Sequence, residues 1–233
     1  MKIRLFTISN LLTLANLLCG AVATVQALKY ENLTAAFWLI AASAVFDYFD
    51  GMVARLLKQS GPLGVELDSM ADDISFGLAP SAVLFVLFHR MNADALLPEW
   101  LGYGCFLFSA CAGLRLAKFN IDETQQAEFR GLPTPAATLV CVSLGLISEQ
   151  TSFTTPAWTL LVVALLLAVL MVCPMPMFAL KFKHFGLKSN RLRYAFLLTA
   201  AVLVVVLRLY ALPAIVGLYV LLSLARMLLY RGA

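Results

Sequence analysis

Four aspartates in a fixed spacing are the residues of this sequence best suited to chemistry. Asp47 and Asp50 lie three residues apart, and Asp68 and Asp72 lie four residues apart after a short polar break. All four fall within long apolar stretches, where an ionised carboxylate costs at least about 2.5 kcal/mol unless it faces an ion, a partner or water. Their types and positions therefore predict a cation site.

Two helices would carry these aspartates, each on one face. At about 100° per residue, each face combines carboxylates with small residues: Asp47, Asp50, Gly51 and Ala54 on the first, with Arg55 at its edge, and Gly64, Asp68, Ala71, Asp72 and Ser75 on the second. The Gly61-Pro62 turn would bring the two faces together.

Four converging carboxylates need a counter-charge in a low dielectric. A pair of Mg²⁺ or Mn²⁺ ions would supply it, and two such ions suit the clamping of a phosphate group. Gly51, Ala54 and Gly64 leave room for a ligand near the backbone, and Arg55 offers a fork that fits phosphate.

Two alternatives without phosphate chemistry stay open. An intramembrane ion-pair network would need more cations than Arg55 and Lys58, the only ones on these two helices. A cation channel or a divalent-cation transporter would explain the carboxylates, but not the glycine, alanine and arginine between them.

Composition indicates which elements position the site. The chain is 62% hydrophobic and 13% charged, against about 25% charged residues in soluble domains. We therefore expect an all-α, polytopic transmembrane helical bundle, and no nucleic-acid partner. It would form a single integral-membrane domain over 1–233, with a catalytic core of about 1–140 and accessory spans over about 150–233.

Apolar runs of about 20 residues mark the spans. We predict eight: 8–28, 34–57, 65–89, 97–118, 133–149, 156–173, 194–210 and 212–230. The weakest boundary is Leu212-Pro213, where a single kinked helix would give seven spans.

Charge orients the bundle. With a cytoplasmic N-terminus, the inner regions collect all of the 17 lysines and arginines except Lys29, Arg90 and Arg208, as the positive-inside rule requires. This predicts a multi-pass protein of the cell (inner) membrane with its aspartates near the cytoplasmic side.

Other features are interpreted as structural. The N-terminus has the pattern of a signal peptide, but polar residues interrupt the apolar run and further spans follow, so we expect no cleavage. The five cysteines lie in or beside apolar runs without CxxC spacing and are interpreted as small buried hydrophobic residues.

The segment from Asp47 to Asp72 resembles the CDP-alcohol phosphotransferase signature D-x2-D-G-x2-A-R-x8-G-x3-D-x3-D at every fixed position. The resemblance implies transfer of a phosphate-linked group from a CDP-linked donor to an alcohol, with release of CMP. It also implies residue roles: metal ligands at Asp47, Asp50, Asp68 and Asp72, a general base at Asp72, and contacts to CDP at Gly51, Ala54, Arg55 and Gly64.

Three further stretches, 75–80, 114–120 and 129–137, are similar to the branch that uses CDP-diacylglycerol and L-serine. This implies formation of phosphatidylserine, and the resemblance covers about residues 1–140. Ser9 stands where many relatives carry Pro, and Lys118 where they often carry Arg, which loses bidentate geometry. Glycerol 3-phosphate, an inositol phosphate or an amino alcohol remain alternative acceptors.

A basic group would recognise the acceptor. Arg115, Lys118, Asn120 and Arg130 lie where spans meet the cytoplasm, and we expect them to bind the serine carboxylate or phosphate; positive-inside anchoring is the alternative. Thr13 and Asn16 share a helical stripe and would line the CDP pocket or form interhelical hydrogen bonds. The spacing of Ser109 and Gly113 suits helix packing or a homodimer.

Overall fold

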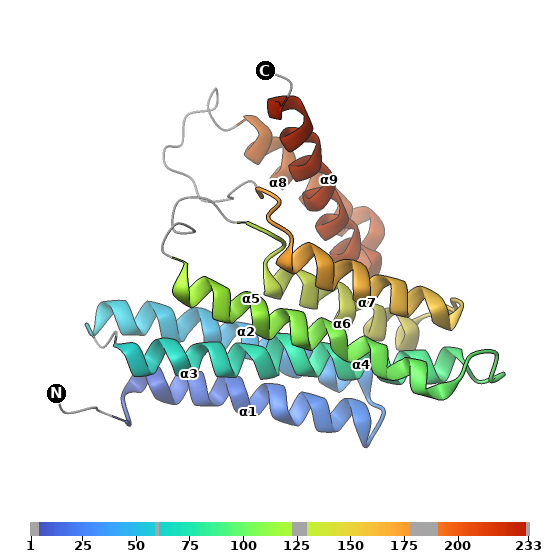
Figure 1. Cartoon of the computed structure of the whole chain (residues 1–233), viewed down its shortest axis with the longest axis horizontal. Helices are drawn as coiled ribbons and strands as arrows, with labels where there is room; N and C mark the ends of the chain where they lie inside the picture. Colours follow the sequence, from blue (N-terminus) through green and yellow to red (C-terminus); the bar gives the residue numbers. More distant parts are fainter. Residues whose placement is uncertain (1–4, 59–60, 123–129, 178–190, 232–233) are drawn as a thin grey trace.

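The protein is built from helices, as the composition predicts. The computed structural model describes residues 5–58, 61–122, 130–177 and 191–231, and within these ranges it contains no strand, only an isolated bridge between Arg130 and Pro176. Figure 1 shows the course of the chain. The expected signal-peptide pattern falls partly on residues 1–4, outside the described residues.

Two antiparallel helices open the chain and a long third rod follows them. The elements are α1 (Ile8–Leu28), α2 (Leu33–Leu56), α3 (Pro62–Asp72), the π-helical turn η1 (Asp73–Leu78) and α4 (Ala79–Met91). Side-chain oxygens of Thr7 and Asn32 cap α1 and α2 by accepting the N–H groups of Asn10 and Ala35. Pro62 starts α3, where its missing N–H group costs no hydrogen bond.

The remaining helices continue this pattern of hairpins. They are η2 (Glu99–Phe106), α5 (Leu107–Ile121), α6 (Thr134–Gln150), α7 (Ala157–Val172), α8 (Arg191–Leu207), η4 (Arg208–Tyr210) and α9 (Ala211–Arg231). Each predicted span therefore coincides with helix. The predicted 65–89 span belongs to one rod that starts at Pro62, and the predicted 97–118 span starts as a 3₁₀-helix.

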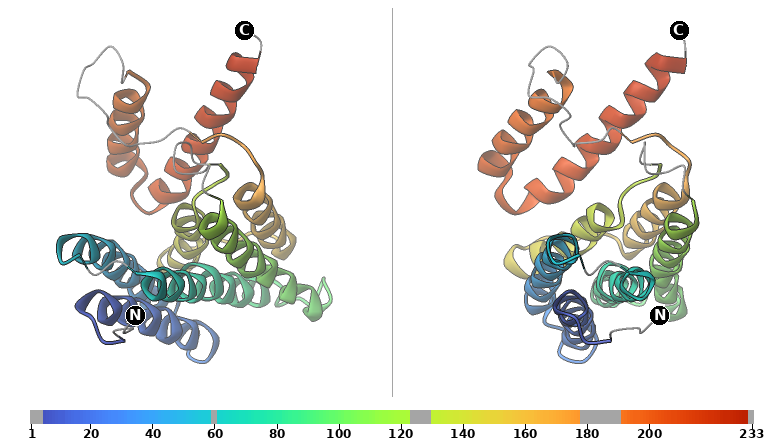
Figure 2. Two further views of the ribbon diagram at one scale, coloured as in Figure 1. Left: turned by 60° about the vertical axis from the view of Figure 1, so that its left-hand side comes forward. Right: turned by 90° about the vertical axis from the view of Figure 1, so that its left-hand side faces the viewer.

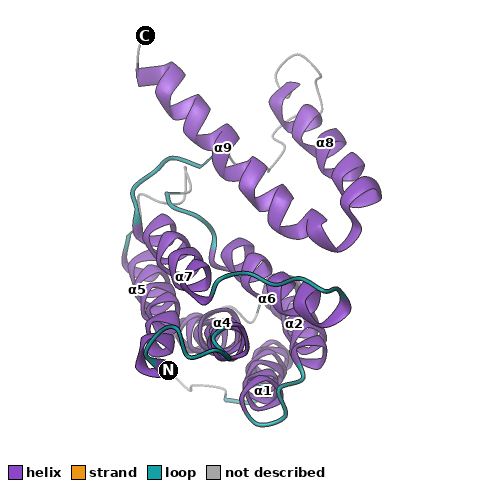
Figure 3. Ribbon diagram, turned by 90° about the vertical axis from the view of Figure 1, so that its right-hand side faces the viewer, coloured by secondary structure: helices purple, strands orange, loops and turns teal. Residues whose placement is uncertain are grey.

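Helix α4 forms the centre of the bundle. Figures 2 and 3 show it enclosed by α1, α2, α5, α6 and α7, and its contacts include all five. Val83, Leu84, Leu87 and Phe88 are almost fully buried. Burial on nearly every side explains why α4 is apolar around its circumference, except at Ser81 and at His89 and Arg90 near its end.

Helices α8 and α9 form a hairpin beside this bundle, inclined to it (Figures 1 and 3), and α9 packs on α6. The chain reverses at Arg208, whose φ of 49° is left-handed. The turn thus precedes the expected Leu212-Pro213 boundary, and Pro213 lies in the first turn of α9, where proline is tolerated. Two helices, rather than one kinked helix, occupy this region.

Five stretches of the described residues are long and apolar enough to cross a membrane: Ile8–Leu28, Leu33–Leu56, Pro62–Met91, Glu99–Ile121 and Arg193–Leu229. The last covers most of α8 and of α9. Helices α6 and α7 are shorter, at 17 and 16 residues. The five longer stretches have the length that crosses a membrane, and they mark a membrane protein.

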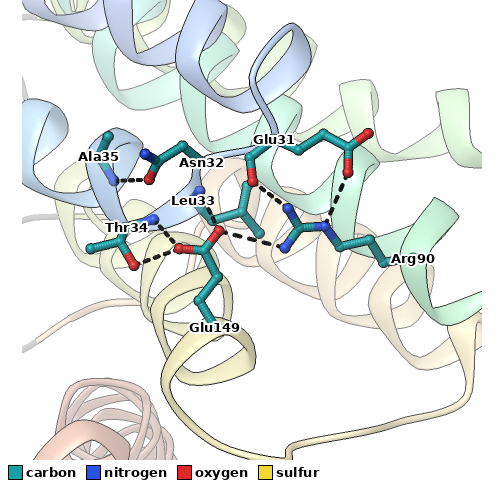
Figure 4. A network of polar contacts seen from close by, with 7 residues as sticks. All are labelled: Glu31, Asn32, Leu33, Thr34, Ala35, Arg90 and Glu149. Atoms are coloured by element: carbon teal, nitrogen blue, oxygen red, sulfur yellow. Dashed lines mark hydrogen bonds and ion pairs between the residues drawn. The ribbon is translucent and has the colours of Figure 1, made fainter.

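One end of the bundle is held by a charged network (Figure 4). Glu149, in the last turn of α6, accepts hydrogen bonds from the backbone N–H groups of Leu33 (2.7 Å) and Thr34 (2.6 Å), and from the Thr34 hydroxyl. Arg90 of α4 pairs with both Glu149 (3.5 Å) and Glu31 (3.4 Å). The negative charge of Glu149 also interacts favourably with the positive, N-terminal end of the α2 helix dipole.

Candidate active site

Three of the four predicted aspartates meet at the other end of α2. Asp47 and Asp50 of α2 and Asp68 of α3 each offer a carboxylate oxygen, and these oxygens lie within 4.8 Å of one another. The spacing of three residues on α2 places two carboxylates on one face, and α3, which packs on α1, brings the Asp68 carboxylate to them. Three of the four carboxylates therefore meet as the spacing predicts, whereas Asp72 does not join them.

The charge of these carboxylates is not balanced by ion pairs in the described part of the chain. Within the described ranges, none of the four aspartates forms an ion pair with a lysine or arginine. Asp50 is 4% exposed, and one oxygen each of Asp50 and Asp68 is buried without a hydrogen-bond donor. Buried carboxylates without counter-charge are costly, so this set fits a divalent cation, which prefers oxygen ligands.

Asp72 lies outside this group of three. Its Oδ1 accepts a hydrogen bond from Asn16 Nδ2 of α1 at 3.1 Å. Asn16 is in turn bonded to Ser43 of α2 and, through its backbone oxygen, to Ser75 of η1. Sequence reasoning did not single out Ser43, although it shares the stripe of Asp47 and Asp50 at spacings of four and seven residues.

A cavity of about 200 Å³ opens beside the aspartates. It is lined by Ser9, Thr13, Asp50, Gly51, Ala54, Arg55, Gly61, Gly64, Val65 and Asp68. The four residues predicted to contact CDP thus all line it, and so does Thr13, whereas Asn16 does not. A Cβ atom added at Gly51 would meet nothing within 4 Å, so this backbone faces open space.

The predicted basic group comes together in part. Arg115 and Lys118 of α5 and Arg130 line a small cavity against the end of α7. Arg115 Nη1 donates to the Thr134 hydroxyl at 2.9 Å, while its Nε is buried without an acceptor. Asn120 instead donates to the Ser69 hydroxyl of α3 at 2.8 Å and does not line this cavity.

Backbone pairing fixes Arg130 against α7. The N–H groups of Gly131 and Leu132 donate to the carbonyl oxygens of Met175 and Leu170, both at 2.8 Å. Gly131 has φ of +78°, and a Cβ atom there would overlap the Met171 carbonyl oxygen. Only glycine tolerates both the left-handed φ and the close approach of this carbonyl oxygen, which explains why residue 131 is glycine.

Comparison of the sequence with known proteins identifies a family. A family model described as CDP-alcohol phosphatidyltransferase matches residues 6–180. The chain belongs to this family. The CDP-alcohol phosphatidyltransferase match extends beyond the 1–140 suggested by the motifs, through α6 and α7.

Individual relatives give the same family. A Helicobacter pylori protein named CDP-diacylglycerol–serine O-phosphatidyltransferase is 31% identical over 233 residues, covering 96% of this chain and 92% of its own length. A Bacillus subtilis protein of that name is 38% identical over 135 residues, covering 58% and 72%. One from Mycobacterium tuberculosis is 34% identical over 166 residues, covering 67% of this chain but only 54% of its own length.

Proposed function

We propose that this protein transfers the phosphatidyl group of CDP-diacylglycerol to the hydroxyl of L-serine, giving phosphatidylserine and CMP. The observation that carries this proposal is the convergence of Asp47, Asp50 and Asp68, which form no ion pair among the described residues, beside a cavity lined by Gly51, Ala54 and Arg55. Family membership and the names of the relatives support the donor and the acceptor.

Two divalent ions, Mg²⁺ or Mn²⁺, would be held by Asp47, Asp50 and Asp68, with Asp72 as a further ligand. When bound, the ions neutralise the carboxylates and draw charge from the pyrophosphate of the donor. Gly51 and Ala54, with Gly64 across the cavity, leave space for the cytidine nucleotide. Arg55 binds the phosphate of CMP as it leaves, because its guanidinium pairs with two phosphate oxygens.

The transfer is a direct displacement. The serine oxygen forms a bond to the phosphorus that carries diacylglycerol, and the bond from this phosphorus to the oxygen of CMP breaks. Asp72 accepts the hydroxyl proton, and CMP leaves with the electron pair. Arg115, Lys118 and Arg130 bind the serine carboxylate, which positions the hydroxyl.

We place the chain in the cell membrane with eight spans, a cytoplasmic N-terminus and the aspartates near the cytoplasmic side. The distribution of lysine and arginine supports this orientation. The lipid donor would then enter sideways from the inner leaflet. A homodimer stays a prediction from the small-residue spacing alone.

A phosphorylated acceptor is the second candidate. Arg115, Lys118 and Arg130 line one cavity, and three basic side chains also suit the phosphate of glycerol 3-phosphate or an inositol phosphate. An amino alcohol has no anionic group, so it would leave these three basic side chains without a negatively charged partner.

Purified protein incubated with CDP-diacylglycerol, Mn²⁺ and each acceptor separates these candidates. We expect CMP release and a phosphatidylserine product with L-serine, loss of both after chelation of divalent ions, and their return when Mn²⁺ or Mg²⁺ is added. Release only with a phosphorylated acceptor would replace serine as the substrate. Full turnover after chelation would overturn the metal site, and metal uptake into liposomes without CMP release would indicate transport.

A further inference from the structure

A buried polar chain links three helical segments behind Asp72. Asn16 of α1, Ser43 of α2 and Ser75 of η1 are each fully buried. The Ser43 hydroxyl donates to Asn16 Oδ1, and Asn16 Nδ2 donates to Asp72 Oδ1 at 3.1 Å. Buried polar groups in an apolar bundle are costly unless paired, and this chain pairs both ends of the Asn16 amide.

The direction of the amide follows from its two partners. The Ser43 hydroxyl donates to the amide oxygen, so the NH₂ group is turned to the carboxylate of Asp72, which can only accept when ionised. Asn16 therefore faces Asp72 as a donor. The amide oxygen of Asn16 faces Ser43, and Asn16 does not line the cavity beside the aspartates.

The backbone of α1 is held at the same place. The Ser75 hydroxyl donates to the backbone oxygen of Asn16 at 3.0 Å. One turn farther along α1, a Cβ atom at Gly20 would lie 2.6 Å from the Ser75 Cα, so glycine permits the close approach of α1 to η1. Because η1 begins directly after Asp72, these contacts fix the distance between Asn16 and Asp72.

We propose that Asn16 is a positioning residue for Asp72, oriented by Ser43. Its amide holds Oδ1 of Asp72, so that Oδ2 is directed to the acceptor hydroxyl. This inference rests on the proposed function, in which Asp72 accepts the proton of that hydroxyl. A proton acceptor must lie within hydrogen-bond reach of its donor, and a carboxylate free to rotate would spend less time in that geometry.

Two variants and a control test this role in the full-length protein. Asn16→Ala removes the donor to Asp72, and we expect kcat to fall about 30- to 100-fold, as for misplaced catalytic groups. Ser43→Ala leaves Asn16 in place but frees its amide to rotate, so kcat should fall by a smaller factor. Ser81→Ala is the matched control, because the Ser81 hydroxyl is equally buried and donates only to the Gly77 carbonyl.

The measurements separate positioning from a structural or metal-binding role. We expect KM for L-serine and CDP-diacylglycerol to stay within about threefold of the unmodified protein. Mn²⁺ binding, measured by electron paramagnetic resonance without substrates, should fall by a much smaller factor than kcat, because Asp47, Asp50 and Asp68 keep their positions and Asp72 is only a further ligand. Unchanged kcat in Asn16→Ala would overturn the proposal. So would a loss of Mn²⁺ affinity that accounts for the whole loss of kcat.

Folding is monitored by thermal denaturation in detergent. If Asn16→Ala fails to fold, Ser43→Ala decides the matter, and an unchanged kcat in that variant overturns the proposal. The failure of the proposed function is distinct, because the unmodified protein would then release no CMP with L-serine, whatever the variants do.

Discussion

At the scale of the residue, the four aspartates of the motif occupy two environments. Asp47, Asp50 and Asp68 turn their oxygens toward one another, and Asp50 and Asp68 each bury an oxygen that has no donor. Asp72 is held by the amide of Asn16. Carboxylates without partners suit a ligand that brings positive charge, whereas an oriented carboxylate suits proton transfer.

Asp68→Asn tests the charge of the cluster. We expect kcat to fall at least about 100-fold, because one charge that holds the reacting groups is lost. Without divalent ions, the melting temperature should stay equal or rise, since one of three mutually repelling charges is removed. CMP release and thermal denaturation in metal-free buffer check both effects.

The exposed Asp94 supplies the control, as Asp94→Asn changes the same chemical group in a loop at the other end of α4. A clear drop in the metal-free melting temperature of Asp68→Asn would argue that its carboxylate is already compensated.

Arg130→Ala tests acceptor binding. Loss of one charge-assisted hydrogen bond to the serine carboxylate should raise the KM for L-serine about tenfold, with little change in kcat or in protein yield. Initial rates over a range of serine concentrations give both constants. Lys29→Ala removes an exposed positive charge at the C-terminal end of α1 and should leave KM and kcat unchanged. An unaltered KM for L-serine in Arg130→Ala would show that Arg130 does not bind the serine carboxylate.

At the scale of the element, irregular backbone connects the helices that carry the site. The segment after Arg130 donates two N–H groups to carbonyl oxygens at the end of α7 and beyond it, and so satisfies part of a helix terminus inside the bundle. The same pairing sets Arg130 beside Arg115 of α5. A basic cavity formed by two distant parts of the sequence therefore depends on the end of a third helix.

Gly131→Ala tests this connection. The left-handed φ and the overlap with the Met171 carbonyl should cost about 1–3 kcal/mol of unfolding free energy, and the displaced segment should raise the KM for L-serine. Thermal denaturation and serine titration measure the two effects.

Gly217→Ala is the matched control in α9, where an added Cβ atom meets nothing within 4 Å. It should stabilise the helix by up to about 1 kcal/mol. A Gly131→Ala variant as stable as the unmodified protein would show that the segment accommodates a side chain.

At the scale of the whole molecule, the aspartates and the charged network lie at opposite ends of α2. Leu33, bound by Glu149, precedes Asp50 by 17 positions, which is about 25 Å at 1.5 Å per residue. The network joins α2, α4, α6 and the loop at Glu31. It thus holds the α1–α2 hairpin in the bundle without contributing a group to the cavity.

Glu149→Ala should separate stability from chemistry. It leaves the backbone N–H groups of Leu33 and Thr34 without their acceptor and removes one of the two carboxylates that pair with Arg90, which should cost about 2 kcal/mol of unfolding free energy. Because the aspartates are remote, kcat and KM should stay within about twofold. Thermal denaturation and steady-state kinetics test this, and a tenfold loss of kcat at a temperature where the variant is folded would show coupling between the two ends.

The sequence by itself determined the helical membrane class, the approximate bounds of the helices and the aspartate motif. These properties are local: apolar runs and the helical repeat act over neighbouring residues. Asp47, Asp50 and Gly51 share a face on any α-helix. A pair such as Gly61-Pro62 favours a turn through its own backbone geometry. For the same reason, the motif sufficed to indicate the CDP-alcohol phosphatidyltransferase family before any fold was known.

Only the tertiary structure decided which of these residues meet. Asp72 faces Asn16 because Ser43 and Ser75 approach from other helical segments, and Arg130 joins Arg115 because α7 ends beside both. The reversal at Arg208 likewise lies ahead of the proline that the sequence suggested as a boundary. Each of these depends on contacts between segments distant along the chain, which helical periodicity does not encode.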